Sequence, residues 1–175
     1  IPDMSYGWSK LSGEYLAGLA VKKYGVDVAI YRPFSGYGED QDLTYPFPAI
    51  MQRVARGDNP VEVWGSGQQT RDFIHISDVV DCVFSTMDRP ADTVLNIGTG
   101  QGVSFTELVR RACYLDGRNA GYVVDTSKPE GVFSRVADTY ALDRLGWKPR
   151  VSLDEGIRRS LEYHRERLDS GAKDV

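Results

Sequence analysis

Hydrophobic positions along this chain follow two patterns, helical spacing and short continuous runs. Apolar residues at three- and four-residue spacing predict helices at residues 5–24, 46–56, 79–87, 105–115, 138–145 and 153–168. Short apolar runs predict strands at residues 26–31, 61–64, 70–76, 93–97 and 121–125. Helices therefore interleave with strands along most of the chain, which is typical of an α/β protein.

The strand predicted at residues 26–31 is apolar along nearly its whole length. Such a run is expected of a parallel strand that is covered on both faces. Together with the helix before it, this strand makes half of a doubly wound unit, and we expect the other half upstream. The loop at residues 32–38 follows the carboxyl end of the strand, where open α/β sheets bind their ligands.

Residues 61–64 and 70–76 predict a β-hairpin, because a glycine-rich turn at residues 65–68 lies between them. Alternation along the second strand places Arg71, Phe73 and His75 on one face. We expect His75 only to pack or to form a hydrogen bond within the sheet. Ser77 or Asp78 is expected to cap the helix that follows.

Gly98 and Gly100 follow a predicted strand and precede a helix, as in a dinucleotide-binding fingerprint. The third glycine of that fingerprint is missing, because position 103 is valine. Ser104 and Glu107 have the spacing of a capping box, which accounts for this stretch as a helix start. We therefore do not expect dinucleotide phosphates to bind here.

Composition narrows the class of protein. Hydrophobic residues make up 41% of the 175 residues and charged residues 26%, as in ordinary globular proteins, and the net charge of -4 argues against a nucleic-acid partner. No apolar run reaches the ~20 residues of a membrane span. Cys82 and Cys113 lack metal-ligand spacing, so we expect two buried thiols in a cytoplasmic protein without a signal peptide. The chain opens with Ile1 instead of methionine, which suggests a piece of a longer protein.

Tyr6 and Lys10 are the strongest candidates for chemistry. Four residues apart on a helix, they lie on one face about one turn from each other. An ammonium close to a phenol favours the phenolate, so this tyrosine could act as a general acid/base at a carbon that bears a hydroxyl or a ketone. Alternatively, both residues are only surface side chains on the first turn of an amphipathic helix and have no chemical role.

Further motifs accompany this pair in a particular order and spacing. They are Tyr6-Gly7-Trp8-Ser9-Lys10 with Glu14, then residues 32–38, 64–75, 95–100 and 145–149. As a set they resemble the second half of an extended short-chain dehydrogenase/reductase that acts on nucleotide sugars. Within that family, Lys128-Pro129-Glu130-Gly131 looks like the branch of GDP-L-fucose synthase and GDP-mannose 3,5-epimerase. No lysine near Pro46 matches the second acid/base of the 3,5-epimerase, which weakens the interpretation as a double epimerase.

The resemblance implies a fold and a division of the chain. It implies the C-terminal part of a doubly wound (Rossmann-type) parallel sheet plus a small mixed α/β substrate-binding domain. The expected Rossmann-type part comprises residues 1–38 and 77–100, and the substrate-binding part residues 39–76 and 101–168. Residues 169–175 would form a tail, and the N-terminal cofactor-binding half would be absent.

The resemblance also implies roles for particular residues. Tyr6 would be the catalytic proton donor and acceptor, while Lys10 would assist it and bind the nicotinamide ribose of NAD or NADP. The remaining expected cofactor contacts are Pro33, Phe34, Ser35 and Gly36. The expected substrate contacts are Arg53, Trp64, Arg71, Lys128 and Arg135. Without its partners, Trp64 would be interpreted as a core residue of the hairpin.

The implied activity is that of an NAD(P)-dependent epimerase, dehydratase or reductase. Its substrate would be a nucleotide-diphosphate sugar, with a GDP-sugar favoured, and the intact protein would be a homodimer formed through the helix at residues 5–24. We expect the isolated chain to be inactive, because it lacks a glycine-rich helix start for the cofactor pyrophosphate. The alternatives are a non-catalytic module that binds a nucleotide sugar, and a fragment that pairs with a separate N-terminal piece.

Overall fold

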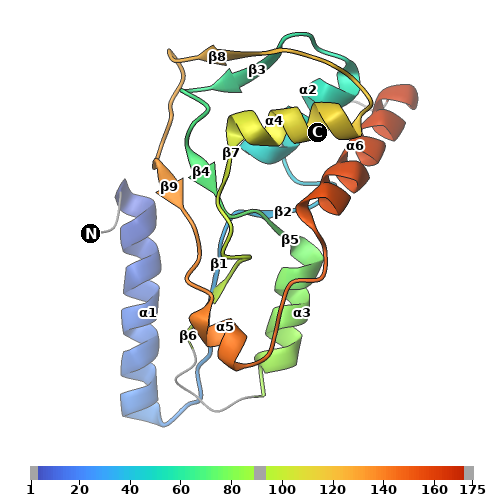
Figure 1. Cartoon of the computed structure of the whole chain (residues 1–175). Coiled ribbons are helices and arrows are strands. Elements are labelled where there is room, and N and C mark those ends of the chain that lie inside the picture. The colour runs from blue at the N-terminus through green and yellow to red at the C-terminus, as the bar shows by residue number, and fades with distance from the viewer. Residues whose placement is uncertain (1–3, 89–93, 172–175) are drawn as a thin grey trace.

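The computed structural model describes residues 4–88 and 94–171 (Figure 1). The helices are α1 (Met4–Tyr24), α2 (Pro46–Arg56), α3 (Ile76–Thr86), α4 (Phe105–Leu115), α5 (Tyr140–Arg144) and α6 (Leu153–Asp169). The strands are β1 (Ile30–Pro33), β2 (Gly36–Tyr37), β3 (Val61–Trp64), β4 (Thr70–Arg71), β5 (Ile74–His75), β6 (Val94–Ile97), β7 (Val103–Ser104), β8 (Tyr122–Asp125) and β9 (Ser134–Arg135). Every predicted helix is confirmed. Thr93, predicted in a strand, and the end of the predicted tail lie outside the described residues.

Most strand pairs are parallel, as an α/β fold requires. β1 pairs with β6, β2 with β5, β3 with β8 and β4 with β9, all in parallel, whereas β4 and β7 run antiparallel. The fold class predicted from the sequence is confirmed. The short strands β2, β7 and β9 were not predicted, because two residues carry no readable alternation.

The predicted hairpin is wrong. β3 pairs with β8, and the stretch predicted as its partner divides into β4 and β5, which join different sheets. The break falls at Asp72 and Phe73, whose adjacent side chains are both buried and serve different neighbours. Phe73 and His75 do share a face, since each packs edge-on against Tyr37.

Two further predictions need correction. The strand predicted from residue 26 begins only at Ile30, and β1 is half-buried to exposed instead of covered on both faces. β6 is its only strand partner in the described part of the chain. His75 caps α3 by accepting a hydrogen bond from the Ser77 amide, so neither predicted residue is the cap. Asp78 is buried and accepts from the amides of Arg150 and Val151 instead.

Buried side chains form two hydrophobic clusters. One joins α2, β3, α4 and α6, and is centred on residues such as Met51, Leu108 and Ile157. The other joins β6, α3 and α5 through Leu95, Cys82 and Leu142.

Both cysteines are buried free thiols as predicted, and burial raises the pKa of Cys82 to about 11. The domain division stays a prediction, although α5, assigned to the substrate-binding part, packs in the second cluster.

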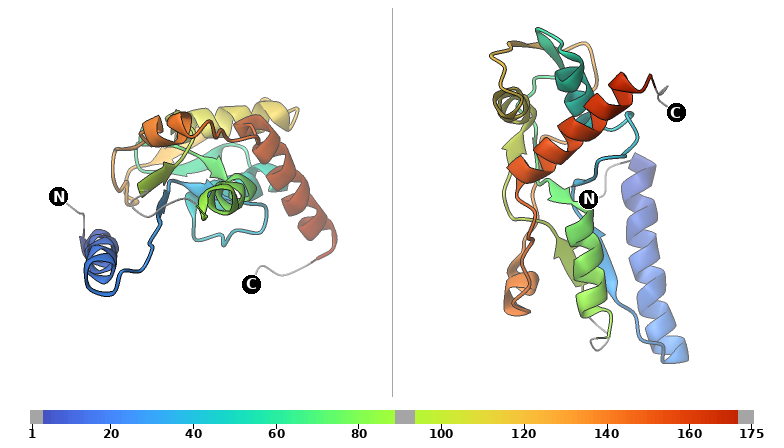
Figure 2. Two further views of the ribbon diagram at one scale, coloured as in Figure 1. Left: turned by 90° about the horizontal axis from the view of Figure 1, so that it is seen from below. Right: turned by 90° about the vertical axis from the view of Figure 1, so that its right-hand side faces the viewer.

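Helix α1 stands at the side of the molecule, away from both clusters. Figure 2 shows it separated from the other helices and followed by the extended segment that leads into β1. Its large apolar side chains, including Trp8, Tyr15 and Leu16, are exposed. An ion pair between Glu14 and Arg32 ties it to β1. Among the described residues, no helix combines the length and the apolar character that crossing a membrane would need.

Candidate functional site

Three of the five predicted substrate contacts line one pocket. Arg53 from α2, Trp64 from β3 and Arg71 from β4 surround a pocket of about 160 Å³. We call it the arginine–tryptophan pocket. Residues 43–46 and residues 129–130 complete its wall, together with Phe105 at the start of α4. The pocket therefore gathers residues from distant parts of the sequence.

Trp64 is an exposed wall of this pocket and not a core residue. Its side chain is 46% exposed, and its indole Nε1 donates a hydrogen bond of 2.7 Å to Glu62. The Nζ of Lys128 lies 5.5 Å from the centre of the ring, within cation–π range. Trp64 is thus held at its edge by a carboxylate and stands beside an ammonium, with part of its ring surface open to a ligand.

The two arginines are anchored by backbone carbonyls. Nη1 of Arg71 donates 2.7 Å hydrogen bonds to the carbonyls of both Thr70 and Val132. Nη1 of Arg53 donates to the Glu62 carbonyl at 3.2 Å. Partial burial, and then the positive charge of Arg135, lower the pKa of Arg71. A guanidinium carries five N–H donors, so these bonds orient each group and leave donors for an anionic ligand.

Tyr6 and Lys10 line a second hollow, between α1 and β1. This α1 cleft has a volume of about 700 Å³ and is lined also by Glu14, residues 28–34 and Arg135. Tyr6 is 67% exposed, and Nζ of Lys10 lies 5.2 Å from the centre of its ring. The two residues are neighbours as predicted, but the ammonium lies against the ring.

The predicted cofactor loop is only partly in the α1 cleft. Pro33 and Phe34 line it. Ser35 and Gly36 do not, because the Ser35 carbonyl accepts from the Ile74 amide and Gly36 enters β2. The structure therefore brings the predicted catalytic pair, Tyr6 and Lys10, together with two of the four predicted loop contacts.

Arg135 connects the two hollows. It lies in β9 directly opposite Arg71 of β4, and it also lines the α1 cleft. The fifth predicted substrate contact thus lies beside the arginine–tryptophan pocket and on the way to Tyr6. This position places positive charge between the two hollows.

The glycines at positions 98 and 100 do not offer an open phosphate site. The amides of Thr99 and Gly100 donate to the carboxylate of Asp72, at 2.8 and 2.9 Å. These are the groups that a phosphate would need, and this protein satisfies them internally. Ser104 caps α4 by accepting from the Glu107 amide, as the capping-box spacing predicts. Both observations agree with the expectation from the sequence.

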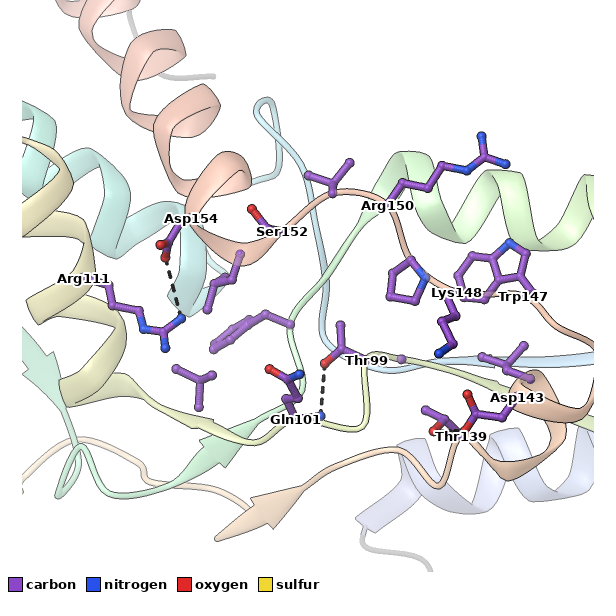
Figure 3. Close-up of a pocket in the computed structure, with 17 residues that line it drawn as sticks. Thr99, Gln101, Arg111, Thr139, Asp143, Trp147, Lys148, Arg150, Ser152 and Asp154 are labelled. Carbon is purple, nitrogen blue, oxygen red and sulfur yellow. Dashed lines mark hydrogen bonds and ion pairs between the residues drawn. The ribbon is translucent and has the colours of Figure 1, made fainter.

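A third hollow was not predicted from the sequence. It has a volume of about 610 Å³ and lies between the loop after β6, α5 and the start of α6 (Figure 3). Arg111 and Asp154 form an ion pair on one side of it, and Lys148 points toward Thr139 and Asp143 on the other (Figure 3). Charges of both signs line it. In the part of the chain that the structure describes, no cluster of His, Cys, Asp or Glu could hold a metal ion.

Parallel strand pairs with helices packed beside them make this an α/β protein with a Rossmann-like fold. The sequence profile of the NAD dependent epimerase/dehydratase family matches residues 2–98, more than half of the chain. The chain belongs to this family, which confirms the resemblance to extended short-chain dehydrogenases/reductases.

Relatives and solved structures agree with this assignment. A GDP-L-fucose synthase from Sinorhizobium fredii is 30% identical over 90% of this chain and 53% of the relative. The UDP-glucose 4-epimerase of Thermotoga maritima, solved with UDP-glucose, is 29% identical with a TM-score of 0.85, over 93% of this chain and 54% of its own. MoeE5, solved with UDP-glucose and NAD, is 35% identical with a TM-score of 0.79, over 93% and 56%. The chain spans about half the length of the curated relatives it matches.

Proposed function

We propose that this chain is the substrate-binding and proton-transfer half of an NAD(P)-dependent epimerase, dehydratase or reductase that acts on a nucleotide-diphosphate sugar. The observation that carries the proposal is the arginine–tryptophan pocket, which brings Arg53, Trp64 and Arg71 together beside Lys128. Lys128 is far from the other three in sequence, and the resemblance assigned all four residues to the substrate. A GDP-sugar is favoured, because GDP-L-fucose synthases are among the relatives.

The pocket residues suit the parts of such a substrate. The open surface of the Trp64 ring offers an apolar face to a base or a sugar. Arg71 and Arg135, side by side on β4 and β9, would meet the diphosphate with charge-assisted hydrogen bonds. Arg53 and Lys128 add positive charge on either side of Trp64. The sugar would then extend past Arg135 toward the α1 cleft.

The α1 cleft suits the chemistry. Tyr6 would donate or accept a proton at the sugar hydroxyl or carbonyl, with the ammonium of Lys10 beside its ring. The cleft also fits one end of NAD or NADP, because Pro33 and Phe34 offer an apolar wall to a flat ring and Lys10 a donor to a ribose hydroxyl. When bound, such a cofactor accepts and returns a hydride. None of the described residues forms an open glycine-rich helix start for its pyrophosphate, so that part of the cofactor would be held by further chain.

One observation favours the alternative, a module that binds a nucleotide sugar without converting it. The arginine–tryptophan pocket is lined by several elements of this chain that pack together, whereas Tyr6 is largely exposed. Binding would then need no other segment, while turnover would. We propose that the isolated 175 residues bind the nucleotide sugar but do not turn it over.

A nucleotide-release experiment tests the proposal. The purified protein is denatured, and released nucleotides are identified by chromatography. The chain is then titrated with GDP-mannose and UDP-glucose by calorimetry and assayed for turnover with added NAD or NADP. Binding without turnover supports the proposal, and the tighter ligand reveals the base. If neither sugar nucleotide binds, the function proposed for the pocket is refuted.

We also propose that the intact protein is a cytoplasmic homodimer that associates through α1. The exposed apolar residues of this helix, such as Tyr15 and Leu16, are the support for this proposal. Sedimentation of the intact protein and its Leu16→Glu variant provides the test. A dimer that the substitution dissociates is the expected result, and a wild-type monomer would contradict it.

A further inference from the structure

Asp72 is a fully buried carboxylate that follows Arg71 directly in the chain. Its Oδ1 accepts hydrogen bonds from the amide and the hydroxyl of Thr99, at 2.8 and 2.6 Å. Its Oδ2 accepts from the amides of Gly100 and Ala137, at 2.9 and 3.1 Å. Four donors compensate for the loss of water around this side chain, which would otherwise be costly to bury.

These bonds join three separate segments of the chain. Asp72 itself follows β4, Thr99 and Gly100 belong to the loop after β6, and Ala137 follows β9. The backbone contributes as well, because the Asp72 amide donates to the Arg135 carbonyl at 3.0 Å. Asp72 therefore links β4, which it follows directly, to β9 and the segment after it, the two strands that carry Arg71 and Arg135.

Gly98 shows that this arrangement leaves no space to spare. A Cβ at position 98 would lie 2.6 Å from Oδ2 of Asp72 and 2.5 Å from the Cβ of Ala137. Both distances are far below van der Waals contact. The loop can approach the carboxylate this closely only because residue 98 has no side chain.

The strand pair needs such support. β4 and β9 are two residues long each, and they place Arg71 directly opposite Arg135. Like charges at opposed positions of a sheet repel and weaken the pairing. The repulsion also contributes to the lowered pKa of Arg71. So short a ladder, under repulsion, is poorly suited to hold two guanidinium groups at a constant spacing.

We propose that Asp72 is a positioning residue for the substrate: its carboxylate clamps β4 and the segment after β9 to the loop after β6, and so fixes the spacing of Arg71 and Arg135 for a diphosphate. This inference rests on the proposed function of the arginine–tryptophan pocket. Asp72 touches no ligand in this role and acts only through the two arginines.

Asp72→Asn tests the clamp with almost no change in shape. Asparagine offers one acceptor oxygen and an NH₂ group, so whichever way the amide is turned its nitrogen would face at least one backbone N–H, which can only donate. GDP and UDP are titrated into the chain by calorimetry, and the tighter one is kept as the probe. We expect Asp72→Asn to weaken its binding by about one to two orders of magnitude, because small displacements of binding groups are costly. Binding of the corresponding nucleoside, which lacks the diphosphate, should change by less than about twofold.

Asp78→Asn is the matched control. Asp78 is also buried and also accepts from two backbone amides, those of Arg150 and Val151, but it lies away from the arginine pair. The Asp78→Asn variant should be less stable than the wild type but should keep the wild-type affinity for the diphosphate. Thr99→Val is the milder variant if Asp72→Asn does not fold: it removes one donor and should weaken diphosphate binding roughly three- to fivefold.

A double-mutant cycle completes the test. In the Arg71→Ala background, the additional effect of Asp72→Asn on diphosphate binding should shrink, because Asp72 acts through that arginine. Two results would overturn the clamp and leave the proposed function intact, provided that the wild-type chain binds the diphosphate. One is an unchanged affinity in a folded Asp72→Asn variant, and the other is full additivity of the Asp72→Asn and Arg71→Ala effects. A wild-type chain that binds neither GDP nor UDP refutes the proposed function, and with it this inference.

Discussion

The arginine–tryptophan pocket and the α1 cleft differ in how they are built. The pocket is small and lies over the larger hydrophobic cluster, with Arg53 and Arg71 held by backbone carbonyls. The α1 cleft is several times larger, and one of its walls is a helix that an ion pair ties to β1. Tyr6 and Lys10 lie on that wall, with the ammonium of Lys10 over the ring of Tyr6.

Under the proposed function, the pocket would recognise the substrate and the α1 cleft would carry the chemistry. Groups that must grip a ligand are preorganised by the chain that carries them, which lowers the cost of binding. We propose that Tyr6 and Lys10, the predicted proton-transfer pair, reach their final geometry only when α1 is supported from its exposed side. Substitutions in the two regions should therefore have different signatures, and the following experiments, from the largest expected effect to the smallest, test that distinction.

Tyr6→Phe removes the proton carrier and leaves the ring. In the intact enzyme we expect the turnover rate to fall by about two to four orders of magnitude, with substrate affinity largely kept. Steady-state kinetics and direct binding measurements check this split. Tyr15→Phe, on the same exposed helix but outside the α1 cleft, is the matched control and should be near normal. Normal turnover of Tyr6→Phe would remove this residue from the mechanism.

Leu108→Ala probes the packed region. Leu108 is completely buried in the larger cluster, so truncation should lower the free energy of unfolding by about 2–5 kcal/mol. Leu16→Ala on α1, where the side chain is 61% exposed, should change it by less than about 0.5 kcal/mol. Urea denaturation of the isolated chain gives both values. A large loss for Leu16→Ala would show that α1 is covered in solution and would remove the contrast between the two regions.

Arg71→Ala probes recognition alone. We expect the affinity for the nucleotide sugar to fall by about one to two orders of magnitude, because the substitution removes charge-assisted hydrogen bonds to the diphosphate. Calorimetry on the isolated chain measures this affinity. Arg159→Ala is the control, since Arg159 is exposed on α6 and pairs with Glu155. Equal affinities for Arg71→Ala and the wild type would contradict the diphosphate role.

Acidification probes the link between α1 and β1. The hydrogen bond from Arg32 lowers the pKa of Glu14 below its ordinary value of 4.5. The stabilisation from this pair is therefore present above that value and is lost as the pH falls through the lower pKa of the folded state. Because the pair is partly exposed, the effect should stay well below about 1 kcal/mol. Unfolding curves of the wild type and Glu14→Gln should differ slightly at pH 6 and converge as the pH falls below the lowered pKa of Glu14; a constant difference would disprove the linkage.

Local signals in the sequence were sufficient for the helices. α4 begins after Ser104 and ends at Leu115, as predicted, because its capping residue and its apolar spacing are both local. The partner of β3 could not be found in this way. The turn at residues 65–68 looks like a hairpin turn, but Gly65 and Gly67 are there to let Glu130 and Thr106 approach closely. Strand pairing over long distances leaves no trace in the local pattern.

The candidate site shows the same limit. Neither composition nor spacing indicates that Arg53 and Arg71 share a pocket, and only the family resemblance grouped them. The roles of Asp72 and Asp78 were missed altogether, because a buried carboxylate with backbone partners looks like any other acidic residue in a sequence. The motif from Arg71 to His75 offered one hint, because it places the acid Asp72 directly before the apolar residues Phe73 and Ile74.

The long separation between paired strands has a kinetic consequence. β1 pairs with β6, β3 with β8 and β4 with β9, and even the shortest separation within a pair, from Arg71 to Val103, is about thirty residues. Each pairing must close a large loop before it gains any contact, and no hairpin among the described residues offers an early nucleus. Helices such as α2 and α4 can form within microseconds, whereas the sheets must wait for their distant partners. A nascent chain would complete β3 only after β8 had been synthesised, and until then the edge of β3 would be exposed to other chains.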